Sequence, residues 1–145
     1  FDGEMQFLNF DGLCFSTVAD SDGWTNNSLT WTAPYSDGGG FPSSLTYRLS
    51  GDLAQLNGFA NAGGDHVQAG SVVGTLPEGY RPAASESAFL LCPTWGWPSA
   101  LSSGYIGTAG VIVQTDGTIN VRTVQQYDGE QQFLMFDGKC INTAF

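Results

Sequence analysis

Two tryptophans separated by one glycine are the residues best suited to binding chemistry. Trp95 and Trp97 flank Gly96 in a stretch bounded by prolines, and Tyr105 follows a few residues later. Aromatic faces stack against sugar rings, because the sugar C–H groups carry partial positive charge and the aromatic face is negative. Trp95, Trp97 and Tyr105 therefore form a candidate glycan-binding site. The alternative interpretation is that they cap one end of the fold or fill a subunit interface.

One acidic stretch has the beginning of a calcium-binding loop. The stretch is Asp20-Ser21-Asp22-Gly23, but a complete loop adds oxygen ligands at fixed spacing and ends in a bidentate glutamate. No glutamate stands at that spacing, so we interpret the stretch as a turn rich in aspartate and asparagine. The sequence predicts no metal site and no cofactor.

The sequence shows no pattern typical of catalysis. His66 is the single histidine of the chain, so it has no second histidine for zinc or a proton relay. Hydrolysis of a glycosidic bond needs two carboxylates that converge on that bond. The aspartates here mostly precede glycines, where turn formation explains them. We therefore predict that the protein is not an enzyme and has no catalytic residues.

The chain carries nearly the same segment at both ends. Residues 1–15 read FDGEMQFLNFDGLCF, and residues 127–141 read YDGEQQFLMFDGKCI. Ten of the fifteen aligned positions are identical, and each copy is an apolar run interrupted by Asp-Gly, which is typical of a β-hairpin. The chain is then either one unit of a head-to-tail series or a domain whose two ends occupy equivalent places.

An isolated two-stranded hairpin is only marginally stable in water, so each copy must dock onto something. We expect edge-strand pairing between a terminal hairpin and its counterpart in the same or a neighbouring subunit. The apolar residues that would seal this assembly contact are Phe7, Leu8, Phe10, Phe133, Leu134 and Phe136.

The three cysteines leave at least one thiol unpaired. Cys14 and Cys140 occupy matching places in the repeat, which makes them the candidate disulfide pair. Buried reduced cysteine is the alternative.

Composition excludes two classes of partner. The chain holds 14 acidic and 4 basic residues, for a net charge of −10, which repels the phosphate backbone of nucleic acids. No stretch is apolar and long enough to insert into a membrane. Only 12% of the residues are charged, which fits an exposed component of a particle.

The pattern of apolar residues predicts an all-β fold in one domain over residues 1–145. Period-two strands are expected over residues 44–49, 53–60, 66–76, 87–91, 105–114 and 118–124, with loops over 33–43 and 92–104. Glycine-rich turns between strands at this spacing favour an antiparallel β-sandwich, jelly roll or barrel. Residues 31–124 would be the sandwich core, and 1–15 and 127–141 the duplicated terminal hairpins.

The turn between the last two core strands can be placed in register. A three-residue loop of Thr115, Asp116 and Gly117 sets Val113 opposite Ile119 and gives one apolar face. A two-residue turn mixes apolar and polar residues on each face. We therefore predict the three-residue loop, with Gly117 supplying a positive φ.

Several landmarks in residues 31–123 resemble a module at the C-terminal ends of bacteriophage tail-fibre and minor tail proteins. They are Tyr47-Arg48-Leu49, then Leu53, Leu56 and Gly58-Phe59, then the string GTLPEGYRP over residues 74–82, and last Val111, Val113 and 116–119. In that string Pro77 ends a strand, Gly79 permits a turn, and Tyr80 and Pro82 can pack over the sheet edge. Arg81 can hold a strand-end carboxylate or carbonyl. The terminal repeats lie outside the resemblance.

The resemblance implies a trimeric, jelly-roll-like head at the virion or extracellular particle surface. Its partners would be other copies of the chain, other virion proteins and a host cell-surface glycan. We therefore expect a virion structural protein of a phage tail fibre or adsorption apparatus that self-assembles and contributes to receptor binding. The alternatives are a carbohydrate-binding module for bacterial surface polysaccharide and a capsid-surface decoration protein.

Overall fold

The computed structural model describes residues 25–26, 29–37, 44–83, 87–96, 105–125 and 131–144, and the regular structure in these residues is β-strand except for one short 3-10 turn. The strands are β1 (Thr25–Asn26), β2 (Thr30–Trp31), β3 (Ser36–Asp37), β4 (Thr46–Ser50), β5 (Leu53–Asn57), β6 (Phe59–Asn61), β7 (Val72–Thr75), β8 (Ala88–Gly96), β9 (Tyr105–Val113), β10 (Thr118–Gln125), β11 (Phe133–Met135) and β12 (Lys139–Asn142). One short 3-10 turn covers Gly63–Asp65. The predicted all-β fold is confirmed.

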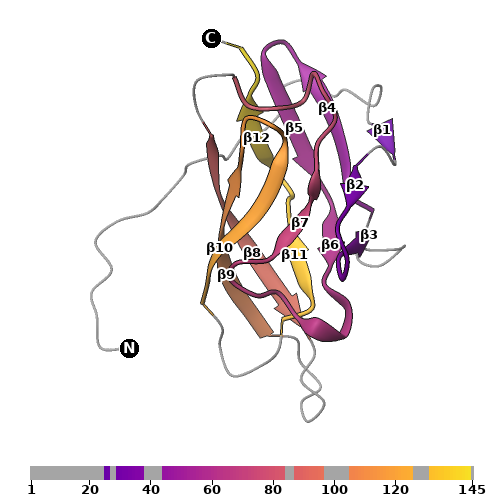
Figure 1. The fold of residues 1–145 in the computed structure, drawn as a ribbon, viewed down its shortest axis with the longest axis vertical. Helices are drawn as coiled ribbons and strands as arrows, with labels where there is room; N and C mark the ends of the chain where they lie inside the picture. Colours follow the sequence, from indigo (N-terminus) through magenta and orange to yellow (C-terminus); the bar gives the residue numbers. More distant parts are fainter. Residues whose placement is uncertain are drawn as a thin grey trace, which may run out of the picture.

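The strands form two antiparallel sheets (Figure 1). The smaller sheet has the order β1-β4-β5-β12, and the larger has the order β2-β7-β10-β9-β8-β11-β6-β3. The pairs between named strands are antiparallel in both sheets. The arrangement therefore matches the predicted antiparallel sandwich or barrel.

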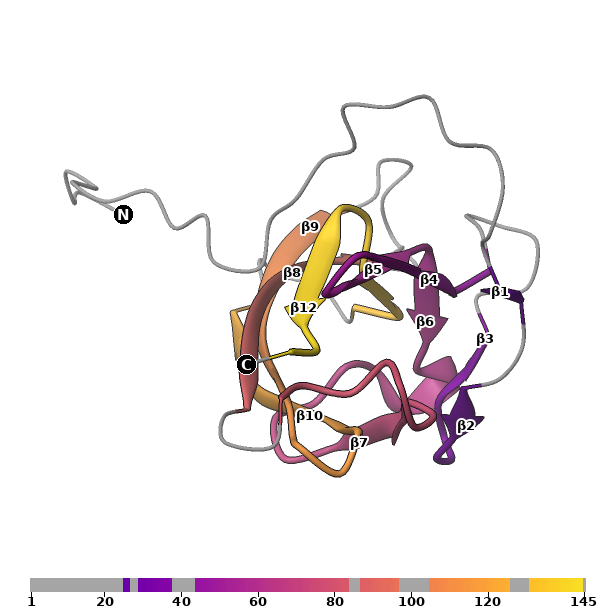
Figure 2. The same cartoon turned by 90° about the horizontal axis from the view of Figure 1, so that it is seen from above.

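The larger sheet curls until its two edges almost meet (Figure 2). Its edge strands β2 and β3 are consecutive in the chain and are joined by residues 32–35. In this connection the Thr32 N–H donates to the Val73 carbonyl at 3.0 Å. Tyr35 is buried, and its hydroxyl lies 2.7 Å from Ser71 Oγ. The connection thus holds the edges together, which leaves little unpaired strand edge there.

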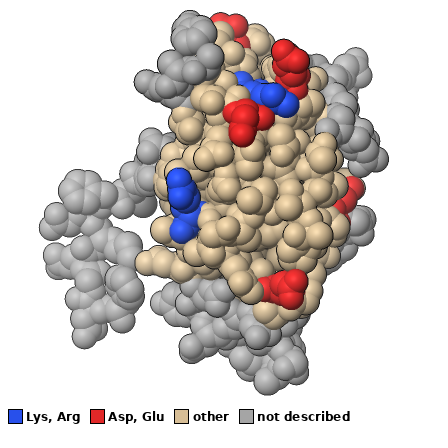
Figure 3. Space-filling view, viewed as in Figure 1, with Lys and Arg blue, Asp and Glu red and all other residues tan. Residues whose placement is uncertain are grey.

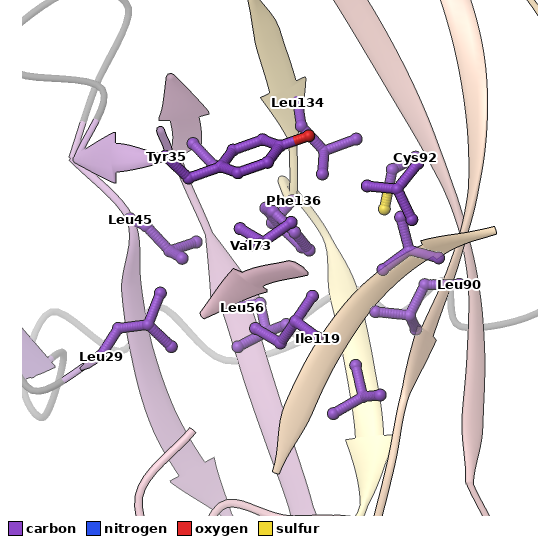
Figure 4. Close-up of a cluster of buried hydrophobic side chains, with 14 of the residues drawn as sticks. Leu29, Tyr35, Leu45, Leu56, Val73, Leu90, Cys92, Ile119, Leu134 and Phe136 are labelled. Atoms are coloured by element: carbon purple, nitrogen blue, oxygen red, sulfur yellow. The ribbon is translucent and has the colours of Figure 1, made fainter. Parts of the chain in front are cut away.

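Apolar side chains from both sheets fill the interior (Figure 4). The predicted register of β9 and β10 is confirmed, because Ile119 pairs with Val113 and Val121 pairs with Val111. All four side chains are fully buried. Gly117 has φ of 90°, as the three-residue loop requires. Alternation along each strand therefore places one face of the β9–β10 pair in the core.

The predicted loop over residues 92–104 is wrong in its first part. Strand β8 continues through Cys92 to Gly96, and the tryptophan at position 95 lies in the sheet. Pro93 pairs with Thr108 of β9 on one side, and the register with β11 includes only Thr94 and Trp95. Proline lacks a backbone donor, and it is accommodated where a strand has no ladder partner.

The C-terminal copy of the repeat does not form the predicted hairpin. Strand β11 pairs with β6 and β8, whereas β12 pairs with β5. The two strands therefore do not pair with each other, and β12 continues in the direction of β11. Met135 pairs with Phe59 and Lys139 with Leu56, so residues 136–138 stand opposite residues 57–58. One extra residue on one strand is a β-bulge. The Asp-Gly of this copy therefore bends a single strand from one sheet into the other.

Candidate functional site

Residues 131–142 fill a long site on their own chain, which we call the strand seat. The seat is formed by β5 and β6 along one side and by the end of β8 along the other. Gly58 separates β5 from β6 at the point where the chain passes between the sheets. Its φ is 103°, and an added Cβ would collide with the Ser44 backbone, so this corner requires glycine.

Backbone hydrogen bonds at both edges hold the inserted strand. Near its start, Val67 N–H donates to the Gln131 carbonyl at 2.8 Å and Ala62 N–H to the Gln132 carbonyl at 2.7 Å. On the other edge, Gln132 N–H donates to the Trp95 carbonyl at 3.0 Å. These bonds involve only backbone atoms, so the seat can accept any strand that carries suitable side chains.

Side chains on the inner face of the strand complete the core. Leu134, Phe136 and Ile141 are fully buried, as is Gln131, and Lys139 is 4% exposed. Leu134 and Phe136 thus pack inside the fold of their own chain. Their expected role in an assembly contact, in the same or a neighbouring subunit, stays a prediction. Phe133 is only half-buried.

The bulge is built from three residues. Asp137 Oδ1 accepts a hydrogen bond from the Gly58 N–H at 2.6 Å, and the Phe136 N–H donates to the Gly58 carbonyl at 2.8 Å. Lys139 N–H donates to the Phe136 carbonyl at 3.1 Å, which closes a tight turn around Gly138 with φ of 69°. Asp137 and Gly138 are thus required by the bend itself.

The described cysteines differ in state. Cys140, on the seat-filling strand, is disulfide-bonded, while Cys92 on β8 is free and buried. Burial raises the pKa of the Cys92 thiol to about 12, and the charge of Lys139 lowers it only in part. Cys14 lies outside the described residues, so its pairing with Cys140 stays a prediction.

The candidate glycan site is only partly within the described residues. Trp95 is half-buried on β8 and stacks with Phe133 of β11, with ring centroids 5.5 Å apart and planes tilted by 33°. Sequence reasoning missed Phe133 as its neighbour, because the register of β8 with β11 joins distant segments. Trp97 lies outside the described residues. The backbone of Tyr105 pairs with Gly96 of β8, and the structure does not describe the Tyr105 side chain.

The outer face of β8 carries an unbroken row of apolar side chains, which we call the β8 stripe. Its residues are Phe89, Leu91, Pro93 and Trp95, which alternate with the buried Leu90, Cys92 and Thr94. Phe89 is 44% exposed, and the other three are half-buried. Large apolar side chains on the solvent side of a strand are typical of a contact surface.

The GTLPEGYRP segment packs against the Asp116-Gly117 turn. Arg81 Nε donates to the Leu76 carbonyl at 3.0 Å, and the Leu76 N–H donates to the Gly117 carbonyl at 2.9 Å. A Cβ at Gly117 would lie 2.5 Å from the Leu76 carbonyl oxygen, so this approach requires glycine. The hydrogen bonds of the Thr118 N–H and hydroxyl lower the pKa of Asp116.

The remaining residues of that segment make the turn that was expected. The Tyr80 N–H donates to the Pro77 carbonyl at 3.3 Å, and Gly79 between them has φ of 93°. The Tyr80 ring meets Tyr47 edge-on at 4.5 Å, and Pro82 is buried. The segment therefore anchors the end of β7 to the core and to the turn between β9 and β10.

Other kinds of site receive no support from the described residues. In the part of the chain that the structure describes, His, Cys, Asp and Glu form no group of three that could hold a metal ion. No helix there is both long and apolar enough to cross a membrane. The acidic stretch at 20–23 and the N-terminal Phe7, Leu8 and Phe10 lie outside the described residues.

Comparisons with models of protein families, with curated proteins and with solved structures found no significant match.

Proposed function

We propose that this chain is a virion structural protein, a subunit of a phage tail fibre or adsorption apparatus that assembles with copies of itself. The β8 stripe is the observation that carries the proposal. Its most exposed member is Phe89, at 44%, beside the half-buried Leu91 and Pro93. A second copy that covers this row would remove apolar surface from water, which is the main favourable contribution to association.

The sparse charge of the surface supports a contact of this kind. Figure 3 shows one face on which acidic and basic side chains are few and scattered over a largely uncharged surface. Charged residues are depleted at the centres of protein interfaces, because they lose hydration there. The resemblance of the GTLPEGYRP segment to phage tail modules supports placement in a virion and an assembly of three copies.

Location on a particle can be tested with an antibody against the folded full chain. Purified particles from the source of the gene are labelled with this antibody and viewed by electron microscopy. We expect gold label at the tail or at another surface structure, in numbers that fit several copies per particle. Intact particles that carry no label, while the antibody binds the purified chain, would contradict the proposal.

A second candidate function is binding of a bacterial surface polysaccharide. The aromatic pair of Trp95 and Phe133 favours it, because both side chains are half-buried and lie next to each other on the sheet. Two adjacent rings with partly open faces offer a platform for a sugar ring. Phage fibre tips combine both activities, so this function is compatible with the first.

A glycan array and a host-envelope pull-down test the second function. Trp95→Ala and Phe133→Ala should each reduce binding at least tenfold if the pair holds the sugar. The matched control is Phe89→Ala, which removes an aromatic side chain from the same strand at its far end. Equal binding by all three variants and the parent chain would show that the pair only packs.

A further inference from the structure

We propose that the N-terminal copy of the repeat is a second strand for the seat and that it occupies the seat of another copy of this chain. The occupant is residues 5–17 of that second copy. The inference rests on the proposed function, because it supplies a joint through which assembling copies exchange a strand. It concerns the edge of β8 that pairs with β11, whereas the β8 stripe lies on the outer face of that strand.

The first support is that the residues the seat requires are repeated at the N-terminus. At each seat position, the matching N-terminal residue lies 126 positions earlier in the chain. Leu8 and Phe10 correspond to the fully buried Leu134 and Phe136. The repeat thus preserves the two side chains that insert most deeply into the core from β11 and the bulge.

The second support is that the bulge is repeated as well. Asp11 corresponds to Asp137, which accepts the Gly58 N–H at 2.6 Å, and Gly12 corresponds to Gly138 with φ of 69°. Within the seat, these two residue types are needed where the strand bends between the sheets. An apolar strand for any other edge would not need an aspartate and a glycine at this place.

The third support comes from positions where the copies differ. Met5, Leu13 and Phe15 correspond to Gln131, Lys139 and Ile141, whose side chains are all buried. The N-terminal copy is therefore apolar at every one of these buried places, and it avoids the cost of removing an amide and an ammonium group from water. Thr17 also matches Thr143, whose N–H donates to the Asp52 carbonyl at 2.8 Å.

Exchange replaces the resident C-terminal strand with an N-terminal strand of nearly the same sequence. The seat holds one strand, so an incoming N-terminal copy displaces residues 131–142 of the receiving chain. Because the two strands carry nearly the same residues, each would be held by similar hydrogen bonds and apolar packing, and concentration can decide which strand is bound. Cys140 is disulfide-bonded, and this bond tethers the resident strand, so we expect a reductant to favour exchange.

A labelled peptide tests the proposal on the full chain as it exists. A fluorescent peptide of residues 1–19 with Cys14→Ser is titrated with the chain, with and without dithiothreitol, and binding is followed by fluorescence anisotropy. We expect saturable binding that is tighter with the reductant, and competition by an unlabelled peptide of residues 127–145. The control peptide carries Leu8→Asp and Phe10→Asp and should bind at least tenfold more weakly.

Cross-linking then locates the bound peptide. Asn142 pairs with Leu53, so Ser16, its counterpart, should lie opposite Leu53 when the peptide fills the seat. Paired residues of antiparallel strands are close enough for a disulfide. On air oxidation, a Ser16→Cys version of the Cys14→Ser peptide should cross-link to a Leu53→Cys chain and not to a Gln125→Cys chain, since Gln125 is exposed at the end of β10, whose sheet neighbours are β7 and β9.

The outcomes separate this inference from the proposed function. Binding with the Leu53 cross-link supports strand exchange. Absence of peptide binding under both redox conditions, with a full chain that is oligomeric by light scattering, overturns exchange and leaves self-assembly in place. Absence of binding together with a monomeric chain overturns both. Equal binding by the control peptide with Leu8→Asp and Phe10→Asp also overturns exchange, since binding would then not depend on these two apolar side chains.

Discussion

The carboxylate of Asp137 accepts a hydrogen bond from the backbone N–H of Gly58 at 2.6 Å, although 79 residues separate the two in the chain. This bond crosses the corner where β5 continues as β6 and β11 continues as β12. Gly58 is buried, so loss of the Asp137 carboxylate would leave its N–H without this hydrogen bond in a place that excludes water. The bond links the bend of one strand to the bend of its neighbour.

Removal of that acceptor should destabilise the fold. We expect Asp137→Ala to lower the free energy of unfolding by about 1–3 kcal/mol, the usual cost of an unpaired buried donor. Asp137→Asn keeps an acceptor oxygen and should lose less than half as much. Urea unfolding monitored by circular dichroism measures both variants. Equal losses for alanine and asparagine would show that the hydrogen bond is not the cause.

Shortening of side chains on the inserted strand should lower stability substantially only on the inner face of that strand. Leu134 is fully buried, so Leu134→Ala should lower the free energy of unfolding by about 2–5 kcal/mol, since it removes apolar packing and leaves a cavity. Met135, the next residue, is half-buried and provides the control, with an expected loss well below that of Leu134→Ala. The midpoints of urea unfolding compare the two. Similar losses would contradict the inward orientation of Leu134.

Much of the local pairing could be predicted from the sequence, because it depends on neighbouring residues. The register of Val111 and Val113 with Ile119 and Val121 follows from alternation around one short loop. The same is true of Gly117, which must adopt a positive φ in a three-residue loop. Such signals lie within a few residues of each other.

The bend at Asp137-Gly138 could not be predicted in this way. Asp-Gly between two apolar runs is typical of a hairpin turn, and a bulge uses the same two residue types for the same φ. The difference lies in the partner strand at residues 53–61, which is far away in the sequence. Likewise the strand through Pro93 could not be predicted, because only the limited register with β11 shows why a strand accepts a proline there.

The turn at Asp116 should make stability depend on pH in the acidic range. The pKa of Asp116 is lowered in the folded state, so its contribution is present above its ordinary value of 3.8 and is lost as the pH falls through the folded value. Asp116→Ala should therefore be less stable than the parent at pH 6, and the difference should shrink below about pH 3.8.

Urea unfolding at several pH values measures this difference. The control is Asp52→Ala, because Asp52 contacts Thr143 through its backbone carbonyl rather than its side chain. The Asp52 variant should track the parent chain across the same range. A gap between Asp116→Ala and the parent that stays constant down to the lowest pH would contradict the assignment.

The free thiol of Cys92 should be inert in the folded protein. Its side chain is fully buried and its pKa is raised to about 12, so very little thiolate is present at pH 8. We expect a thiol reagent such as Ellman's reagent to label Cys92 slowly in the native chain and rapidly in guanidinium chloride. Labelled peptides identify the cysteine by mass spectrometry. Rapid labelling of Cys92 in the native chain would place it at the surface and contradict the packing of β8.

The β8 stripe should control association of copies. Phe89→Asp places a charge on the most exposed member of the stripe and should shift the chain toward monomer. Leu49→Asp is the matched control, because Leu49 is similarly exposed, at 48% against 44% for Phe89, but lies on the smaller sheet. Analytical ultracentrifugation compares the two. A Leu49 variant that dissociates as much as the Phe89 variant would show that the stripe has no special role.

The mass of the purified full chain in solution, measured by size-exclusion chromatography with light scattering, tests the central claim most directly. The account predicts a particle of several copies, with three favoured by the resemblance to phage tail modules, that dissociates on dilution or on Phe89→Asp substitution. A chain that elutes with the mass of one copy over the whole accessible concentration range would contradict it.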